Sequence, residues 1–149
     1  MSAITLLVDE PKWRSHRGLQ AQLKRVAEAA RRAAKLKGGF CILLADDRAL
    51  RRLNRDFRGL DKPTNVLSFP AEAAAYRGDI AMAYGVTKRE AKAGGKNFAD
   101  HAAHLVVHGV LHLAGHDHQR PKDAKAMEAL EVKILARFGI ADPYAIMPQ

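Results

Sequence analysis

Residues 101–118 read HAAHLVVHGVLHLAGHDH, and most of the chain's seven histidines lie in this stretch. Apolar residues fill the positions between the histidines, so the sequence predicts a long helix over residues 98–114 that ends at Gly115. His108 and His112 are four residues apart and therefore project from one face of that helix, about one turn apart. Their ring nitrogens can thus meet a single cation.

A third histidine completes a metal-binding pattern. His118 follows Gly115 by three residues, and the glycine lets the backbone turn so that this imidazole returns as a third ligand. The spacing H-x-x-x-H-x-x-G-x-x-H matches the long zinc signature H-E-x-x-H-x-x-G-x-x-H at the three histidines and the glycine. Three imidazoles with one open position are typical of a catalytic site, so we predict one Zn²⁺ per chain with water as its fourth ligand. His116, two residues before His118, is a competing ligand.

One position of the zinc signature differs, because Gly109 stands where the signature has its glutamate. That glutamate is the general base of the metalloprotease mechanism, so its absence weakens a peptidase interpretation and leaves phosphodiester hydrolysis open. Asp117 is a catalytic candidate that either orients a ligand or handles a proton, and it is equally a candidate turn-capping residue. His101 and His104 extend the same helix face, where they contact substrate, support the metal ligands from behind, or have only surface or packing roles.

Outward from this helix, short apolar runs alternate with helical patterns. The predicted strands cover residues 4–8, 40–45, 65–69 and 79–83. One predicted helix starts at Leu19 and ends at Gly38-Gly39, a second is capped by Asp46 or Asp47 and ends at Gly59, a third covers residues 98–114, and a fourth runs from Pro121 to a stop at Gly139. A further helix starts at a capping box over residues 87–90. The order β-α-β-α-β-β-α-α-α predicts an α+β fold with a small mixed four-stranded sheet and about five helices. The first two strands should be parallel because a helix joins them. The third and fourth should be antiparallel, joined by a loop over residues 71–78.

Length and composition bound the class of protein. The chain has 149 residues, of which 48% are apolar and 28% charged, which is typical of one globular domain over residues 1–149. A single cysteine, Cys41, excludes a disulfide framework. The sequence has no apolar run of about 18 residues. Its N-terminal residues also lack the basic segment that precedes the apolar segment of a signal peptide. We therefore expect neither a membrane helix nor a signal peptide. The expected location is the reducing cytoplasm.

Positive charge is concentrated in the first half of the chain. The formal net charge is +9, and residues 11–62 hold fifteen Lys and Arg against five Asp and Glu. This asymmetry indicates a polyanionic partner, of which nucleic acid is the commonest, or else a solvated helix face.

Arg58 ends the most basic predicted helix, which also carries Arg51, Arg52 and Arg55. Its guanidinium can hold a phosphate through two parallel hydrogen bonds and balance charge that develops on it. The alternative for Arg58 is a surface ion pair with Asp56 or Asp61, which would contribute little to stability.

Several segments together resemble the YbeY family of bacterial rRNA maturation factors. Residues 108–118, HGVLHLAGHDH, are similar to the family's H-G-x-L-H-L-x-G-Y-D-H. Residues 53–58 (LNRDFR), 61–69 (DKPTNVLSF) and 78–81 (GDIA) resemble its L-N-x-x-x-R, D-x-P-T-D-V-L-S-F and G-D-I-x. The matching segments occur in the family's order over about residues 46–118, so the resemblance is specific.

The resemblance implies a zinc-dependent endoribonuclease that is specific for single-stranded RNA and has a fold similar to the zincins. It implies action in 16S rRNA 3′-end maturation and ribosome quality control, with the small ribosomal subunit and assembly proteins such as the Era GTPase as partners, and no DNA. The family's metal histidines fall on His108, His112 and His118, and its functionally important arginine falls on Arg58.

Two positions depart from the family pattern, and two other functions stay open. Asn65 stands at a usual aspartate, which puts a charge-dependent role there in doubt, and His116 replaces a usual tyrosine. A zincin-type peptidase is one alternative, against which Gly109 and the basic first half argue. The other is a non-catalytic ribosome assembly factor with a structural metal site. The sequence separates it poorly from an endoribonuclease, because both functions need three metal ligands and a basic surface.

Overall fold

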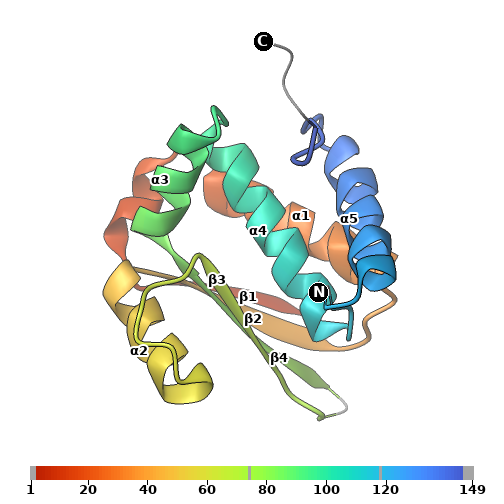
Figure 1. The fold of residues 1–149 in the computed structure, drawn as a ribbon, viewed down its shortest axis with the longest axis horizontal. Helices are drawn as coiled ribbons and strands as arrows, with labels where there is room; N and C mark the ends of the chain where they lie inside the picture. Colours follow the sequence, from red (N-terminus) through yellow and green to blue (C-terminus); the bar gives the residue numbers. More distant parts are fainter. Residues whose placement is uncertain (1–2, 74, 118, 146–149) are drawn as a thin grey trace.

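The computed structural model describes residues 3–73, 75–117 and 119–145, and this part of the chain forms a four-stranded sheet with five α-helices (Figure 1). The strands are β1 (Ile4–Val8), β2 (Gly39–Ala45), β3 (Val66–Pro70) and β4 (Tyr76–Ala83). The helices are α1 (Leu19–Ala33), α2 (Asp47–Arg58), α3 (Tyr84–Ala93), α4 (Phe98–Leu113) and α5 (Pro121–Ala136), with a 3-10 helix, η1 (Pro11–Ser15), before α1. The predicted α+β class and order of elements are confirmed.

The sheet is mixed, with the strand order β1-β2-β4-β3. β1 and β2 are parallel and joined through α1, as predicted, and β3 pairs antiparallel with β4. β2 also runs parallel to β4, so the second crossover passes through α2 and β3. The edge strand β3 therefore lies at one side of the sheet, next to β4, with Ser68 opposite Ile80.

The two faces of the sheet carry different layers. Alternate strand residues such as Ile42, Leu44 and Ile80 belong to the main core, which they form together with side chains of α1, α4 and α5. The opposite face carries a smaller cluster that includes Leu50 of α2 and Leu67 of β3. Figure 1 shows α4 at the centre of the first layer, and α4 contacts both β3 and β4 as well as α1, α3 and α5. This burial agrees with a helix that is apolar around most of its circumference.

Local end signals hold α2 in place. The Asp46 carboxylate accepts the backbone N–H of Ala49 at 2.8 Å, which caps the start of the helix. Gly59 ends the helix in the left-handed conformation, at φ 71°, where a glycine has no steric penalty. These two signals place Arg58 in the last position of α2.

Two predicted element starts, those of β4 and α3, are wrong by three residues. The sequence predicts a loop over residues 71–78, but β4 begins at Tyr76, because its parallel pairing with β2 reaches Gly39 opposite Tyr76, beyond the last antiparallel pair of Pro70 and Gly78. α3 begins at Tyr84 rather than at a capping box, and the Thr87 hydroxyl donates to the Ala83 carbonyl oxygen at 2.6 Å from within the first turn. In both cases the element starts three residues before the point that the local sequence indicates. Within the described ranges, no helix is long and apolar enough to cross a membrane.

Candidate metal centre

The two histidines that are four residues apart on α4 face one another through their Nε2 atoms. The Nε2 atoms of His108 and His112 are 3.1 Å apart. Two imidazole nitrogens that bind one tetrahedral zinc at about 2.0–2.1 Å would be separated by about 3.3–3.4 Å. Both rings are half-buried at the edge of the core and present nitrogen donors that suit zinc. The pair therefore fits the predicted metal.

The predicted third ligand, His118, lies outside the described residues. Of the part of the chain that the structure describes, no three His, Cys, Asp or Glu side chains are grouped so that they could hold a metal ion. The competing ligand His116 lines a separate hollow with Gly115 and Asp117 rather than the one beside His108. The assignment of His118 stays a prediction.

Arg58 reaches the same hollow as the histidine pair. A hollow of about 280 Å³ is lined by the following residues from α2, the following loop, β3 and α4: Arg58, Asn65, Val66, Ser68, Pro70, His108 and His112. Arg58 and the two histidines are far apart in the sequence. They meet at one hollow because β3 packs against α4. The structure thus brings together a guanidinium and a pair of metal-type nitrogens, as the predicted site requires.

The ion-pair alternative for Arg58 is wrong. The two carboxylates near it pair with other arginines, since Arg51 Nε lies 2.8 Å from Asp61 Oδ1 and Arg55 Nε lies 3.0 Å from Asp56 Oδ1. Arg58 is exposed and makes no hydrogen bond or ion pair with any residue of the described ranges. Its guanidinium is therefore available to an anion in the hollow.

Packing against the sheet explains why a glycine stands where the zinc signature has glutamate. A Cβ atom on Gly109 would lie 2.9 Å from Ile80 Cγ2, closer than side chains approach one another. The Ser68 hydroxyl donates to the Gly109 carbonyl oxygen at 3.0 Å, which ties α4 to β3 at this point. A glutamate here would have to displace the buried Ile80 side chain of β4, so the packing disfavours the peptidase general base at this position.

Glu131 is a site residue that the sequence analysis missed. This side chain of α5 is fully buried, and its Oε2 accepts a hydrogen bond from His108 Nδ1 at 2.8 Å. Burial opposes its ionisation, but hydrogen bonds from His104, His108 and Tyr144 hold the pKa of Glu131 at about 2. A signal was present, because Glu131 lies four residues after Met127 and three before Ile134 on the apolar face of its helix.

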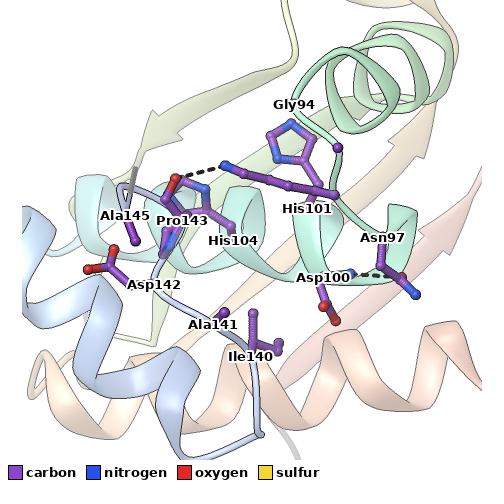
Figure 2. Close-up of a pocket in the computed structure, with 12 residues that line it drawn as sticks. Gly94, Asn97, Asp100, His101, His104, Ile140, Ala141, Asp142, Pro143 and Ala145 are labelled. Atoms are coloured by element: carbon purple, nitrogen blue, oxygen red, sulfur yellow. Dashed lines mark hydrogen bonds between the residues drawn. The ribbon is translucent and has the colours of Figure 1, made fainter. Parts of the chain in front are cut away.

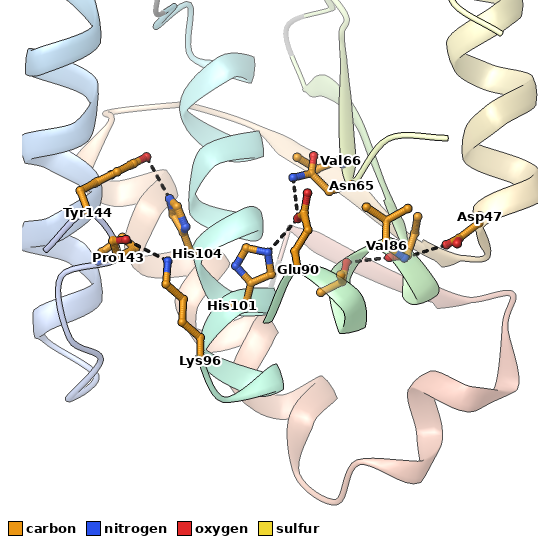
Figure 3. Close-up of polar contacts among 12 residues, drawn as sticks. Asp47, Asn65, Val66, Val86, Glu90, Lys96, His101, His104, Pro143 and Tyr144 are labelled. Atoms are coloured by element: carbon orange, nitrogen blue, oxygen red, sulfur yellow. Dashed lines mark hydrogen bonds and ion pairs between the residues drawn. The ribbon is translucent and has the colours of Figure 1, made fainter. Parts of the chain in front are cut away.

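The other two α4 histidines have partners outside the hollow, as Figure 3 shows. His104 Nε2 lies 3.1 Å from the Tyr144 hydroxyl, and the hydroxyl in turn donates to Glu131. His101 Nε2 lies 2.9 Å from Glu90 of α3. Burial lowers the pKa of His101, and the Glu90 carboxylate partly offsets that effect. Both rings pack and hydrogen-bond within the fold, and neither lines the hollow beside Arg58.

Asn65 and Asp117 make local contacts. The Asn65 amide donates to Glu90 Oε1 at 3.0 Å, a bond that an ionised aspartate cannot make because it has no hydrogen to donate (Figure 3). Asp117 is exposed and its Oδ1 accepts the backbone N–H of Gln119 at 3.1 Å, which is the turn-capping role. Asp117 does not line the hollow of His108, so its geometry favours capping over proton transfer.

The segment after α5 folds back over the other end of α4. Figure 2 shows a second hollow, of about 220 Å³, between His101 and His104 of α4 and residues 140–145. Lys96 closes part of it, because its Nζ donates to the Pro143 carbonyl oxygen at 2.8 Å. This contact holds Tyr144 beside α4.

Comparisons with known proteins agree in pointing to one family. The family model described as endoribonuclease YbeY matches residues 8–139. The chain is 44% identical to "Endoribonuclease YbeY" of Rhodopseudomonas palustris strain BisA53, with 96% of this chain and 90% of that protein covered. It is 51% identical to the protein of the same name from Chelativorans sp. strain BNC1, over 80% of this chain and 77% of that protein.

A solved structure shares the fold. The solution structure of TM1509 from Thermotoga maritima matches with a TM-score of 0.63 over 97% of each chain, at 23% sequence identity. That likeness shows the fold alone, and the zincin-like assignment stays a prediction. The family match and the identities to its curated members show that this chain belongs to the YbeY endoribonuclease family.

Proposed function

We propose that this protein is a metal-dependent endoribonuclease that cleaves single-stranded RNA. The observation that carries the proposal is the hollow in which Arg58 of α2 lies together with His108 and His112 of α4. Metal-type nitrogens and an exposed guanidinium that line one hollow suit a phosphodiester, which needs both activation of a nucleophile and neutralisation of charge. The name endoribonuclease that its relatives carry supports the same activity.

The residues divide the chemistry between them. His108, His112 and, by its spacing, His118 would hold one zinc ion, which would supply Lewis acidity to activate water or a phosphate oxygen. Arg58 binds a non-bridging phosphate oxygen and balances the charge that grows on the phosphodiester during cleavage. Asn65 and Ser68 line the same hollow and restrict where the phosphate can lie.

The proposed biological role is maturation of the 16S rRNA 3′ end and ribosome quality control in the cytoplasm, on the small ribosomal subunit and with assembly proteins such as the Era GTPase. The resemblance to the YbeY family and the basic outer helix α2 support this role. Exposed Arg51, Arg52 and Arg55 on that helix suit an RNA backbone near Arg58.

Metal removal tests the proposed activity directly. Protein treated with a chelator and then dialysed should lose cleavage of a fluorescent single-stranded RNA, and stoichiometric zinc should restore it, because the histidines alone provide no activated water. A fully paired RNA duplex of the same sequence serves as the control substrate and should stay intact. Zinc-loaded protein that binds this RNA without cutting it would contradict the proposal and favour the non-catalytic assembly factor.

We expect RNA binding to weaken steeply as salt rises, because each neutralised phosphate releases condensed counterions. Reversing the charge of Arg51, Arg52 and Arg55 together should lower the slope of log affinity against log salt by about 2, at about 0.7 per contact on single strands. Fluorescence anisotropy at several salt concentrations gives this slope. The matched control reverses the three exposed lysines of α5, Lys122, Lys125 and Lys133, and should keep the parent slope. Equal slopes for both triple variants would exclude α2 as the RNA-binding face.

A further inference from the structure

A buried carboxylate of α5 lies behind the proposed metal ligands, and the catalytic proposal does not use it. We propose that Glu131, locked by Tyr144, is a positioning residue that fixes the tautomer and orientation of the His108 imidazole. The inference rests on the proposed function in that His108 is taken as a metal ligand. It goes beyond that function because Glu131 and Tyr144 lie outside the hollow that holds Arg58.

The contact between Glu131 and His108 determines which ring nitrogen carries the hydrogen. Glu131 Oε2 lies 2.8 Å from His108 Nδ1, and an ionised carboxylate only accepts hydrogen bonds. Nδ1 must therefore carry the hydrogen. In the neutral ring the lone pair then lies on Nε2, the atom that faces His112 at 3.1 Å. A carboxylate that accepts the second N–H of a ligating histidine orients the ring and raises its basicity toward a metal.

The carboxylate itself is held from its other side. Tyr144 donates its hydroxyl hydrogen to Glu131 Oε1, and His104 Nε2 lies 3.5 Å from the same oxygen. Both carboxylate oxygens thus have partners, and the side chain is 0% exposed, so turning away from His108 would break these contacts inside the core. The tyrosine is in turn held by a hydrogen bond from its backbone N–H to Asp142 Oδ1 at 2.8 Å.

Nothing in the packing alone requires a charge at this position. Glu131 shares its helix face with Met127 and Ile134, both buried in the main core. A buried ionised group is costly unless hydrogen bonds compensate it, and an apolar residue of similar volume is often no less stable there. The contact with a proposed metal ligand provides the reason for a carboxylate among apolar neighbours.

The test compares variants that keep the volume of the side chain. In metal-free protein, ¹⁵N NMR of the residue-assigned imidazoles should show His108 as the Nδ1–H tautomer, and Glu131→Leu should abolish that preference. Zinc dissociation constants, measured by competition with a chelator, should rise about 10–100-fold in Glu131→Leu, the usual cost of losing such a partner. Glu131→Gln can still accept the Nδ1 hydrogen, so it should keep the tautomer but weaken zinc about tenfold through the lost charge. Tyr144→Phe should also raise the zinc dissociation constant, but by less than Glu131→Leu does.

Glu128→Gln is the matched control, since it removes the same charge one turn earlier on α5 and should leave both readouts at the parent values. A parent-like tautomer and zinc constant in Glu131→Leu would show that Glu131 only pins α5 to α4. If that variant fails to fold, a parent-like zinc constant in Glu131→Gln overturns the inference instead. Failure of the parent protein to bind zinc would contradict the proposed function. The tautomer comparison in metal-free protein would still decide whether Glu131 sets the His108 ring.

Discussion

The His112→Ala protein is expected to fold but to bind zinc about 10²–10³-fold more weakly than the parent. Structural zinc sites contribute about 10–16 kcal/mol from four ligands, so one ligand is worth about 2.5–4 kcal/mol, and each 1.4 kcal/mol is a factor of ten. The His112 ring is half-buried beside the hollow, so truncation to alanine removes the Nε2 atom that faces His108. At limiting zinc, cleavage of single-stranded RNA should fall by the same factor. Zinc content after gel filtration and cleavage rates at several zinc concentrations measure the two effects.

Two further histidine variants make this result specific. His118→Ala should match His112→Ala, because the zinc signature assigns both side chains to the same ion. His116→Ala is the matched control, since this ring lines a different hollow, with Gly115 and Asp117, and should keep the parent affinity. Full zinc occupancy in either His112→Ala or His118→Ala would show that the ligand assignment is wrong, and zinc loss in His116→Ala would identify the competing ligand.

Arg58→Lys is expected to lower single-turnover cleavage about 10²–10³-fold while RNA affinity changes little. One preorganised contact that stabilises charge only in the transition state is commonly worth this much. Lysine keeps the positive charge but loses the planar fork that binds two phosphate oxygens at once. Stability should be unaffected, because Arg58 is exposed and forms no ion pair within the described ranges. Rates at saturating enzyme, with binding measured separately by anisotropy, separate the two parameters.

Arg52→Lys is the matched control for Arg58. Arg52 lies on the same helix and is also exposed, but it does not line the hollow of His108 and His112. Its replacement by lysine should leave the cleavage rate within about twofold of the parent, since charge at a backbone contact is retained. If Arg58→Lys and Arg58→Ala both cleave at the parent rate, Arg58 is not a catalytic residue. A loss confined to affinity would make it a contact that positions the RNA.

The helices could be predicted closely because their ends are marked by neighbouring residues. Asp46 and Gly59 bound α2 through hydrogen bonding and backbone conformation that depend on a few positions along the chain. Pro121 opens α5 in the same way, since its missing N–H costs nothing in the first turn. Local signals of this kind do not depend on how the chain packs afterwards.

The boundaries that were predicted wrongly depend on partners far along the chain. Tyr76 joins β4 because Gly39 of β2 pairs with it, although the preceding residues carry a loop-like composition. Thr87 fits a capping box, but the helix begins earlier, at Tyr84. The Trp13 and Phe98 rings pack against Tyr84 at 5.3 and 5.2 Å between ring centroids, which helps to hold the start of α3. Packing of this sort overrides a local capping signal.

The sequence by itself determined the histidine pair, because the 3.6-residue period of a helix places His108 and His112 on one face whatever surrounds them. Only the tertiary structure decided that Arg58 shares their hollow, since α2 and α4 lie on opposite faces of the sheet and β3 at its edge links them. It also decided that Glu131 lies behind His108, because helix packing sets which α5 side chain meets α4. The helical period relates residues that are four apart in the sequence. Sheet order and helix packing instead bring together residues that are far apart in the sequence, and no local pattern indicates such contacts.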